Sequence, residues 1–417
     1  RSRSGRAAPG GRREGRVVSA PGALGTRGIV LLAIASAIVT ANAYYIHPII
    51  GPVADSFGVG DGLIGAVPAL NQVALALGVL LLLPLGDRIS NRRLVVACLL
   101  AQVAALGTMA VVEDFRLFLA ASSCLGFFTI TPYLLPAYTS KRVDPARIGF
   151  VTAVLTTGVV AGVQISRVAS GAIGEYLGWR AVYWMAAVLM ALSTVLLPLL
   201  MDEEAQRERR DDGSYARLIA SMARLALEHR RVMLSGLIQG LNFAMFLASW
   251  LGIGLYFTSP ALDLGTDTVG YMAAFSAIGL LTTPRLGRWA DGQGAERARF
   301  IMSLLQLLGV LALALVAWRW WLLLLPIVLL SVSGPLIDIT GRMTSLSQPP
   351  AVRTRLMSLY ITLMFLGGGL GSWSGTYAYE LGGWWGTVAL TGGLSMLVCL
   401  LSALQLQGSQ DGVRFRI

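Results

Sequence analysis

The chain is built from long apolar runs separated by short, charged gaps. The run "GLIGAVPALNQVALALGVLLLL" is followed by "PLGDRISNRRLVV", and the next apolar run, "ACLLAQVAALGTMAVV", begins at once. A helix of about 20 apolar residues crosses the roughly 30 Å hydrocarbon core of a bilayer. Lipid cannot satisfy open backbone groups, so such runs cross as helices, and the continuous apolar character excludes the alternating strands of a β-barrel. The pattern therefore restricts the chain to an all-α integral membrane bundle.

Twelve runs are long enough to span a bilayer. They lie near 28–52, 62–85, 94–112, 115–138, 148–173, 179–200, 231–257, 267–286, 298–317, 320–341, 353–378 and 384–406. Only 13% of all residues are charged, against roughly 25% in a soluble domain, which agrees with lipid as the main solvent.

The basic residues are divided unevenly between the two ends of these spans. With the amino terminus placed in the cytoplasm, 29 of the 33 Lys and Arg residues fall on the cytoplasmic side, including Arg285, Arg288, Arg297 and Arg299 as one loop group. The exceptions are Arg116, Arg180 and Arg319 outside and Arg167 within a span. The positive-inside rule predicts a cell-membrane protein with both termini in the cytoplasm. The net charge of +11 is then a topology signal rather than a sign of nucleic-acid binding.

The charged stretch in the middle of the chain divides the spans into six plus six. We expect a disordered basic tail at 1–27, a first half at 28–200, a linker at 201–230, a second half at 231–406 and a tail at 407–417. In the linker, Leu218, Ile219, Met222 and Leu225 share one helical face, which predicts an amphipathic helix on the inner membrane surface. Its expected role is a tether, with regulation as the alternative.

Two landmarks indicate that the halves are copies of one unit. Asp87 in "GDRISNRR" corresponds to Asp291 in "GRWADGQGAERAR", 204 residues later. Trp179 in "YLGWRAVYW" corresponds to Trp384 in "ELGGWWGTV", 205 residues later. Duplicated six-helix units are typical of transporter folds.

The two charged loops resemble the signature loop of the major facilitator superfamily, roughly Gly-x-x-x-Asp-Arg-x-Gly-x-Arg-Arg. The matching residues are Asp87, Arg88, Arg92 and Arg93 in the first copy and Gly287, Asp291, Gly294 and Arg297 in the second. The first copy has Leu83 and Ser90 where glycines are usual. The resemblance implies twelve helices in two six-helix repeats. It also implies that Asp87 latches the cytoplasmic side while the outside is open; the alternative is that these charges only set topology.

Within that superfamily, three stretches resemble the drug and small-molecule exporter branch. They are "ANAYYIHPIIGPVADSFGV", "GVVAGVQISRVASGAIGEYLGWRAVYW" and "RTRLMSLYITLMFLGGGLGSWSG". The chain departs from the antiporter pattern at Val163, where proline is usual after glycine, and at Ser122, where arginine is frequent. The resemblance implies a secondary active transporter that moves a drug or metabolite by alternating access, with proton-coupled efflux. An importer or uniporter, and a transport-dead membrane sensor, remain as alternatives.

The resemblance also implies that spans 1, 4, 7 and 10 line a central cavity. Their polar and aromatic residues are Thr40, Asn42, Tyr44, Tyr45, His47, Thr129, Tyr133, Gln239, Asn242, Phe246 and Trp250. The alternative for the polar ones is hydrogen bonding between helices, and Tyr44 and Tyr45 equally suit a membrane interface. His47 lies near the outer end of its span, which favours a hydrated residue without a role.

Arg167 and Asp338 are ionisable residues placed inside spans. A charge at the bilayer centre costs roughly 2.5–3.5 kcal/mol on insertion scales, so such residues usually face a cavity or a partner. We expect both to take part in coupling: Arg167 by facing the cavity and serving an anionic or polar cargo, or a carboxylate on a neighbouring helix, and Asp338 by binding and releasing a proton. The structural alternatives are a snorkelling Arg167 and a pair between Asp338 and Arg342.

Other classes of protein lack the residues they need. Two histidines, His47 and His229, cannot supply a metal set or a catalytic pair, so no enzyme, metal or cofactor is expected. Cys98, Cys124 and Cys399 have no pair spacing. The expected partners are a small-molecule substrate, protons and the lipid bilayer, and the expected state is a monomer.

The topology makes a direct prediction. Reporter fusions placed near Gly213 and at the carboxyl terminus should both report a cytoplasmic location, because the basic residues retain those segments inside. A carboxyl terminus outside the cell would contradict the six-plus-six arrangement.

Overall fold

The computed structural model describes residues 25–140, 142–144, 147–201 and 215–414, and within these it contains helices and connecting turns but no strand. The expected tail up to residue 24, the charged linker 202–214 and residues 415–417 lie outside the described residues. The side chain of Asp87 also lies outside them, so the expected latch stays a prediction.

The first half runs through six helical passes. They are α1 (Thr26–Ala41) with α2 (Ile46–Phe57), α3 (Asp61–Ile64) with α4 (Ala66–Leu82), α5 (Asn91–Val111), α6 (Phe115–Phe128) with α7 (Thr131–Ser140), α8 (Ile148–Leu177) and α9 (Trp179–Leu199). The linker helix α10 (Tyr215–Glu228) follows.

The second half repeats the arrangement. Its passes are α11 (Arg230–Thr258), α12 (Thr266–Phe275) with α13 (Ile278–Gln293), α14 (Ala295–Ala312) with η3 (Leu313–Ala317), η4 (Trp320–Leu323) with α15 (Leu324–Leu346), and α16 (Pro350–Arg414). Helix α16 contains two passes that meet at Gly383, whose φ of 55° breaks the helix.

The twelve-pass prediction is therefore confirmed, with longer helices than expected at several ends. Ten helical segments of the described chain are long and apolar enough to cross a membrane, and one of these is the double pass of α16. The α12–α13 pass is not among the ten, because its end near Arg285, Arg288 and Asp291 is polar.

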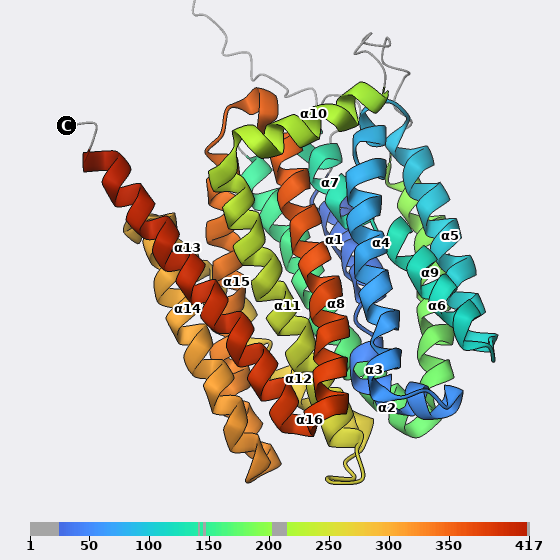
Figure 1. Ribbon diagram of the computed structural model, residues 1–417. Helices are drawn as coiled ribbons and strands as arrows, with labels where there is room; N and C mark the ends of the chain where they lie inside the picture. The colour runs from blue at the N-terminus through green and yellow to red at the C-terminus, as the bar shows by residue number, and fades with distance from the viewer. Residues whose placement is uncertain (1–24, 141, 145–146, 202–214, 415–417) are drawn as a thin grey trace, which may run out of the picture.

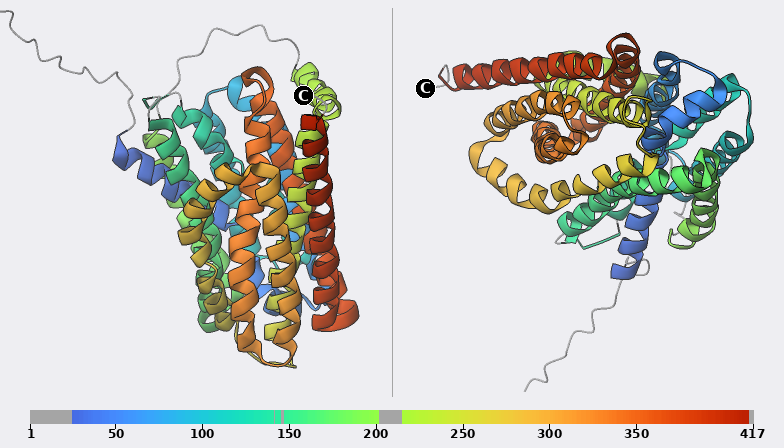
Figure 2. Two further views of the ribbon diagram at one scale, coloured as in Figure 1. Left: turned by 90° about the vertical axis from the view of Figure 1, so that its left-hand side faces the viewer. Right: turned by 90° about the horizontal axis from the view of Figure 1, so that it is seen from below.

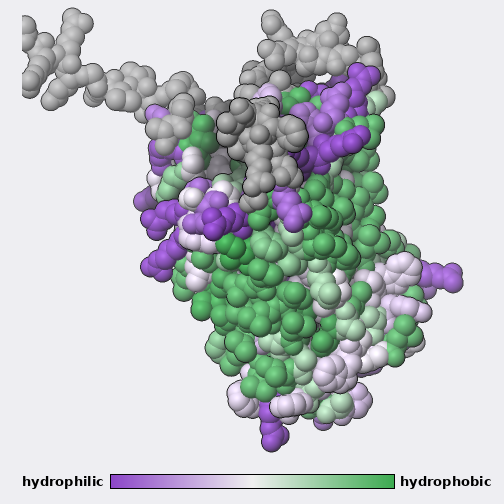
Figure 3. Space-filling model, turned by 60° about the vertical axis from the view of Figure 1, so that its left-hand side comes forward, coloured by the Kyte–Doolittle hydropathy of each residue, from purple (hydrophilic) through white to green (hydrophobic). Residues whose placement is uncertain are grey.

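The two halves lie side by side, as the view along the bundle in Figure 2 shows. The start of α1, the helix α10 and the end of α16 lie at one end of the bundle, which we call the linker end (Figure 1). The other end we call the opposite end. In Figure 3 a broad apolar surface covers the middle of the bundle, and the strongly polar residues gather toward the linker end. This distribution is that of a protein whose sides face lipid.

Small residues bring the same pairs of helices into backbone contact in both halves. In the first half, a side chain added at Gly158 or Gly162 of α8 would meet the α1 backbone, at Ala33 and Ala37 respectively. In the second half, Gly367 of α16 faces the backbone of Gly240 on α11. Lipid offers no hydrophobic drive for helix association, so close packing of this kind holds the passes together. Val163 follows Gly162 at the position where proline is usual, and the contact between α8 and α1 forms without that proline.

The duplicated landmarks share local geometry. Gly178, before Trp179, has a φ of 82°, and Gly383, before Trp384, has a φ of 55°; both lie in the left-handed region that glycine tolerates. The signature loops differ at the matching position: Gly294 has a φ of 84°, whereas Ser90 has a φ of −58°. The missing glycine therefore gives the first loop a different turn.

Part of the apolar face of the linker helix α10 packs on the protein. Met222 and Leu225 are buried, and Leu225 contacts Val232 and Leu356. At its start, the Tyr215 hydroxyl donates to the Leu81 carbonyl of the first half. The helix thus bridges both halves, and its expected place at the inner membrane surface stays a prediction.

Arg299 also differs from the expectation that grouped it with the loop arginines. It is buried, and its guanidinium donates to the Ser235 hydroxyl at 2.9 Å, the Gln405 side chain at 2.6 Å and the Thr340 carbonyl at 2.7 Å. Its neighbour Arg297 is exposed. Arg299 lies two residues after Arg297 on α14, so its side chain points into the interior of the second half. There its hydrogen bonds connect α14 with α11, α15 and α16.

Candidate functional site

Two helices of the first half are interrupted near mid-bundle, and one glutamine joins the breaks. Pass 1 changes from α1 to α2 at residues 42–45, and pass 4 changes from α6 to α7 at residues 129–130. The Gln102 side chain of α5 accepts hydrogen bonds from Asn42 and Thr129, both at 3.3 Å, and donates to the Phe128 carbonyl at 3.0 Å. Backbone groups freed by a break need such partners inside a membrane.

The second half contains a matching pair. The Gln306 side chain of α14 donates to the Asn242 side chain of α11. Asn242 in turn donates to Gln239 at 2.9 Å and to the Gly334 carbonyl of α15 at 3.2 Å. Asn42 and Asn242 lie on the first pass of their halves, and Gln102 and Gln306 on the third, so the network follows the internal repeat.

These networks assign four of the expected cavity residues to helix packing. Each of these side chains forms hydrogen bonds within its own half: Asn42, Thr129, Gln239 and Asn242. Their partners Gln102 and Gln306 were not expected, because the resemblance directed attention to passes 1, 4, 7 and 10. Their separation of 204 residues, the same as between Asp87 and Asp291, is the sequence signal that would have found them.

A second set of expected residues gathers around Arg167. The Arg167 side chain is fully buried at 0% exposure, and its Nε–H donates to His47 Nδ1 at 3.2 Å. Its guanidinium lies 5.4 Å from the ring centre of Tyr44, 4.9 Å from that of Phe246 and 4.4 Å from that of Trp250. Tyr44 and His47 belong to the first half and both other rings to the second. We call these five residues the Arg167 cluster.

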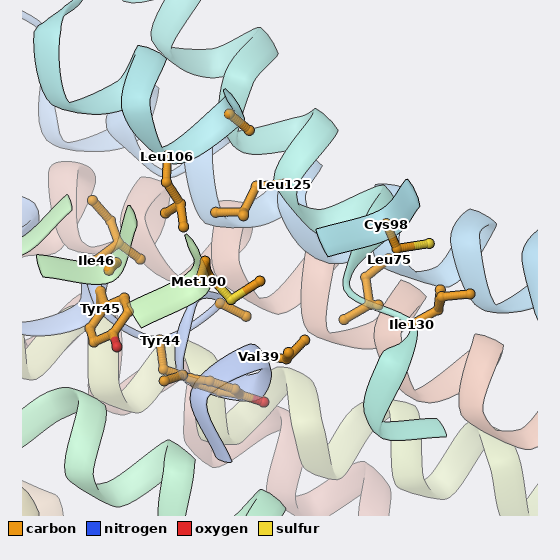
Figure 4. Close-up of a cluster of buried hydrophobic side chains, with 14 of the residues drawn as sticks. Val39, Tyr44, Tyr45, Ile46, Leu75, Cys98, Leu106, Leu125, Ile130 and Met190 are labelled. Carbon is orange, nitrogen blue, oxygen red and sulfur yellow. The ribbon is translucent and has the colours of Figure 1, made fainter. Parts of the chain in front are cut away.

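His47 therefore differs from the expected hydrated residue. It is fully buried, it accepts from Arg167, and its ring lies edge-on to Tyr44 with centres 5.4 Å apart. Tyr44 and Tyr45 are buried as well, within the apolar cluster of Figure 4, so neither serves as an interface anchor. The buried Thr40 hydroxyl has no hydrogen-bond partner.

Asp338 forms a second charged group closer to the linker end. Arg342 Nε donates to its two carboxylate oxygens at 3.0 and 2.9 Å, and the Tyr360 hydroxyl lies 3.0 Å from one of them. Tyr360 belongs to the same apolar cluster as Tyr133 of the first half, whose ring packs edge-on against Phe365 of the second half. The pair thus lies where the two halves meet.

The residues of the signature loops are less tightly placed. Arg88 is exposed, with its guanidinium 5.5 Å from the ring centre of Tyr215, and Arg93 and Asp291 are also exposed. Arg92 is partly buried. Gly287 lies within α13, and its open surroundings leave space for a side chain.

The halves are closely joined at the opposite end. The Thr266 backbone N–H of α12 donates to the Glu175 carboxylate of α8 at 2.8 Å, and the Thr266 hydroxyl donates to the Gly171 carbonyl at 2.8 Å. Gly171 and Gly270 bring the two backbones together. Helix α13, which continues this pass toward the linker end, has few contacts with α8. The passes therefore diverge toward the linker end.

Two six-helix halves that enclose charged groups between them define a membrane transporter, not an enzyme. The sequence model of the Major Facilitator Superfamily matches residues 32–340. The chain belongs to that superfamily and is a multi-pass membrane protein that transports small molecules.

Relatives are transporters as well. The chain is 27% identical over 373 residues to the uncharacterized transporter YgaY of Escherichia coli O157:H7, covering 89% of this chain and 94% of the relative. It is 24% identical over 280 residues to the multidrug resistance protein MdtG of Serratia proteamaculans, covering 66% and 64%. Among solved structures, a bacterial homolog of the human lysosomal transporter Spinster matches with a TM-score of 0.75 and 13% identity, covering 91% of this chain and 96% of that one. This last likeness shows the fold alone.

The assignment of Asn242 and Gln306 to helix packing can be tested with a double-mutant cycle. Asn242→Leu and Gln306→Leu should each destabilise the fold, and the double variant should lose less than the sum, with a coupling of roughly 0.6–1 kcal/mol. Unfolding free energies in mixed detergent micelles provide the measurement. Ser303→Ala, on the same helix as Gln306 and with its hydroxyl bonded to the local Phe300 carbonyl, should be additive with Asn242→Leu. Additive losses in the Asn242–Gln306 cycle would exclude the pair.

Proposed function

We propose that the protein is a proton-coupled exporter of small organic molecules that works as a monomer by alternating access. The observation that carries this proposal is the Asp338–Arg342 pair. It is the kind of group that can take up and release a proton within the transport path.

The pair is neither fully buried nor fully exposed. The Arg342 side chain is 32% exposed and that of Asp338 is 24% exposed. About a quarter to a third of each side chain is thus accessible, so the carboxylate can be reached by a proton while Arg342 holds it in place. Protonation of Asp338 would remove the charge that Arg342 faces and would free the guanidinium.

The position of the pair connects this step with movement of the halves. Asp338 and Tyr360 belong to the second half, whereas Tyr133 belongs to the first. A change of charge at Asp338 therefore changes the interaction across the interface. A ligand or proton shifts a conformational equilibrium by its difference in affinity for the two states. Proton coupling at Asp338 would also explain how the protein can work as an antiporter although it has Ser122 where arginine is frequent.

Export is supported by the relationship to proteins named for multidrug resistance, and the stretches that resemble the exporter branch agree with it. Import by the same fold is the alternative outcome. Direction is decided by transport in vesicles of known orientation.

Asp338→Asn should remove the dependence of transport on a pH gradient, while exchange without a gradient survives, because Asn keeps the shape but cannot take up a proton. The measurement is accumulation in proteoliposomes of a panel of lipophilic cations, neutral compounds and aromatic carboxylates. Infrared difference spectra should show a protonated carboxyl band on acidification that the variant lacks.

The matched control is Asp263→Asn, an exposed acid in the turn before α12, which should behave as the native protein. Undiminished gradient-driven accumulation by Asp338→Asn would make the pair with Arg342 structural. Failure of every compound to move would refute transport of these classes.

A further inference from the structure

The interior of the bundle holds a guanidinium without a counter-ion. Arg167 is fully buried, and no carboxylate of the described chain lies within ion-pair distance of it. Its neighbours are uncharged: His47, the Gln164 side chain, which accepts from Nη1 at 3.0 Å, and three aromatic rings. A buried charge that lacks a partner is costly, and inside a membrane it usually marks a functional site.

Arg299 shows what a purely structural buried arginine looks like in the same bundle. All three of its guanidinium nitrogens donate hydrogen bonds. In Arg167, by contrast, Nη2 is buried and has no acceptor among the residues that the structure describes. The atoms around the two guanidinium groups differ as well. Hydroxyl, amide and carbonyl oxygens surround Arg299, whereas Arg167 is surrounded largely by rings.

The tautomer of His47 adds a second free donor. Arginine nitrogens only donate, so His47 Nδ1 must accept from Arg167 and carries no hydrogen. In the neutral imidazole the hydrogen then resides on Nε2. This nitrogen is buried and has no acceptor either. The cluster thus presents two unsatisfied N–H donors beside a fixed positive charge.

The chemistry of the missing partner follows from these groups. It must supply acceptor oxygens and negative charge, and it must tolerate the faces of Tyr44, Phe246 and Trp250. A carboxylate on a flat apolar body meets both conditions, because guanidinium binds carboxylate through paired hydrogen bonds and aromatic rings pack on flat apolar groups.

We propose that Arg167 and His47 bind the carboxylate of an aromatic organic anion, and that such anions are the substrate class of the transporter. This inference rests on the function proposed above and specifies its cargo. Phe246 and Trp250, two of the three aromatic rings over Arg167, come from the second half and the arginine comes from the first, so separation of the halves removes these two rings from the guanidinium. The site therefore opens and closes with the conformational change.

The test compares three ligands of one shape and different charge: benzoate, benzamide and benzamidinium. Titration calorimetry on the full chain in detergent should show benzoate binding at least tenfold more tightly than the other two. Arg167→Gln should remove this preference. Arg167→Lys, which keeps the charge but loses the planar fork, should weaken benzoate binding while the protein stays folded.

The matched control is Arg180→Gln, an arginine at the opposite end that donates to the Val112 carbonyl, and it should retain the preference. Three results overturn the proposal: no benzoate binding, equal or tighter binding of benzamidinium, or an undiminished preference in both Arg167 variants. If the native protein transports cations in proteoliposomes while benzoate does not bind, the transport function stands and the anion site is refuted.

Discussion

The structure depends on the fact that lipid offers no hydrogen-bond partners. Every pass is therefore helical, and buried side chains bond at the places where helices break: Gln102 donates to the Phe128 carbonyl of pass 4 and accepts from the Asn42 side chain of pass 1. Helices approach to backbone contact through small residues because apolar side chains gain nothing by leaving lipid. Several buried hydroxyl and amide groups of the described residues also lack partners, but in Arg167 the unsatisfied donor belongs to a charged group, and the unsatisfied donor of His47 lies on the ring that it contacts.

Much of the fold could be predicted because its signals are long and repeated. Apolar runs determined the passes, and the offset between Trp179 and Trp384 revealed the duplication that Gly178 and Gly383 share in their backbone. The predictions that the structure corrects depended on the direction in which a side chain points. Arg299 and Arg297 look alike in sequence, and only the phase of α14 buries one of them. Hydropathy likewise predicts that α10 has an apolar face without specifying whether lipid or protein covers it.

The candidate site was predicted in composition but not in arrangement. Tyr44, His47, Phe246 and Trp250 were expected as cavity residues and Arg167 as a charge facing the cavity, but that the four surround this one arginine was not expected. Asp338 was expected as a coupling acid, and it lies in a separate group with Arg342 and Tyr360. The two groups, one toward each end of the bundle, share residues of both halves. This division suggests separate positions for cargo and proton that movement of the halves connects.

Alternating access requires the two halves to move as two bodies about these groups, and distances across the bundle test this most directly. With Cys98, Cys124 and Cys399 replaced, spin labels at Leu117 and Trp318 report on the opposite end, and labels at Leu199 and Leu346 on the linker end; all four positions are exposed. Electron–electron resonance between acidic and neutral pH should show one distance lengthening as the other shortens. Distances that stay fixed at both ends, or that change together, would contradict alternating access.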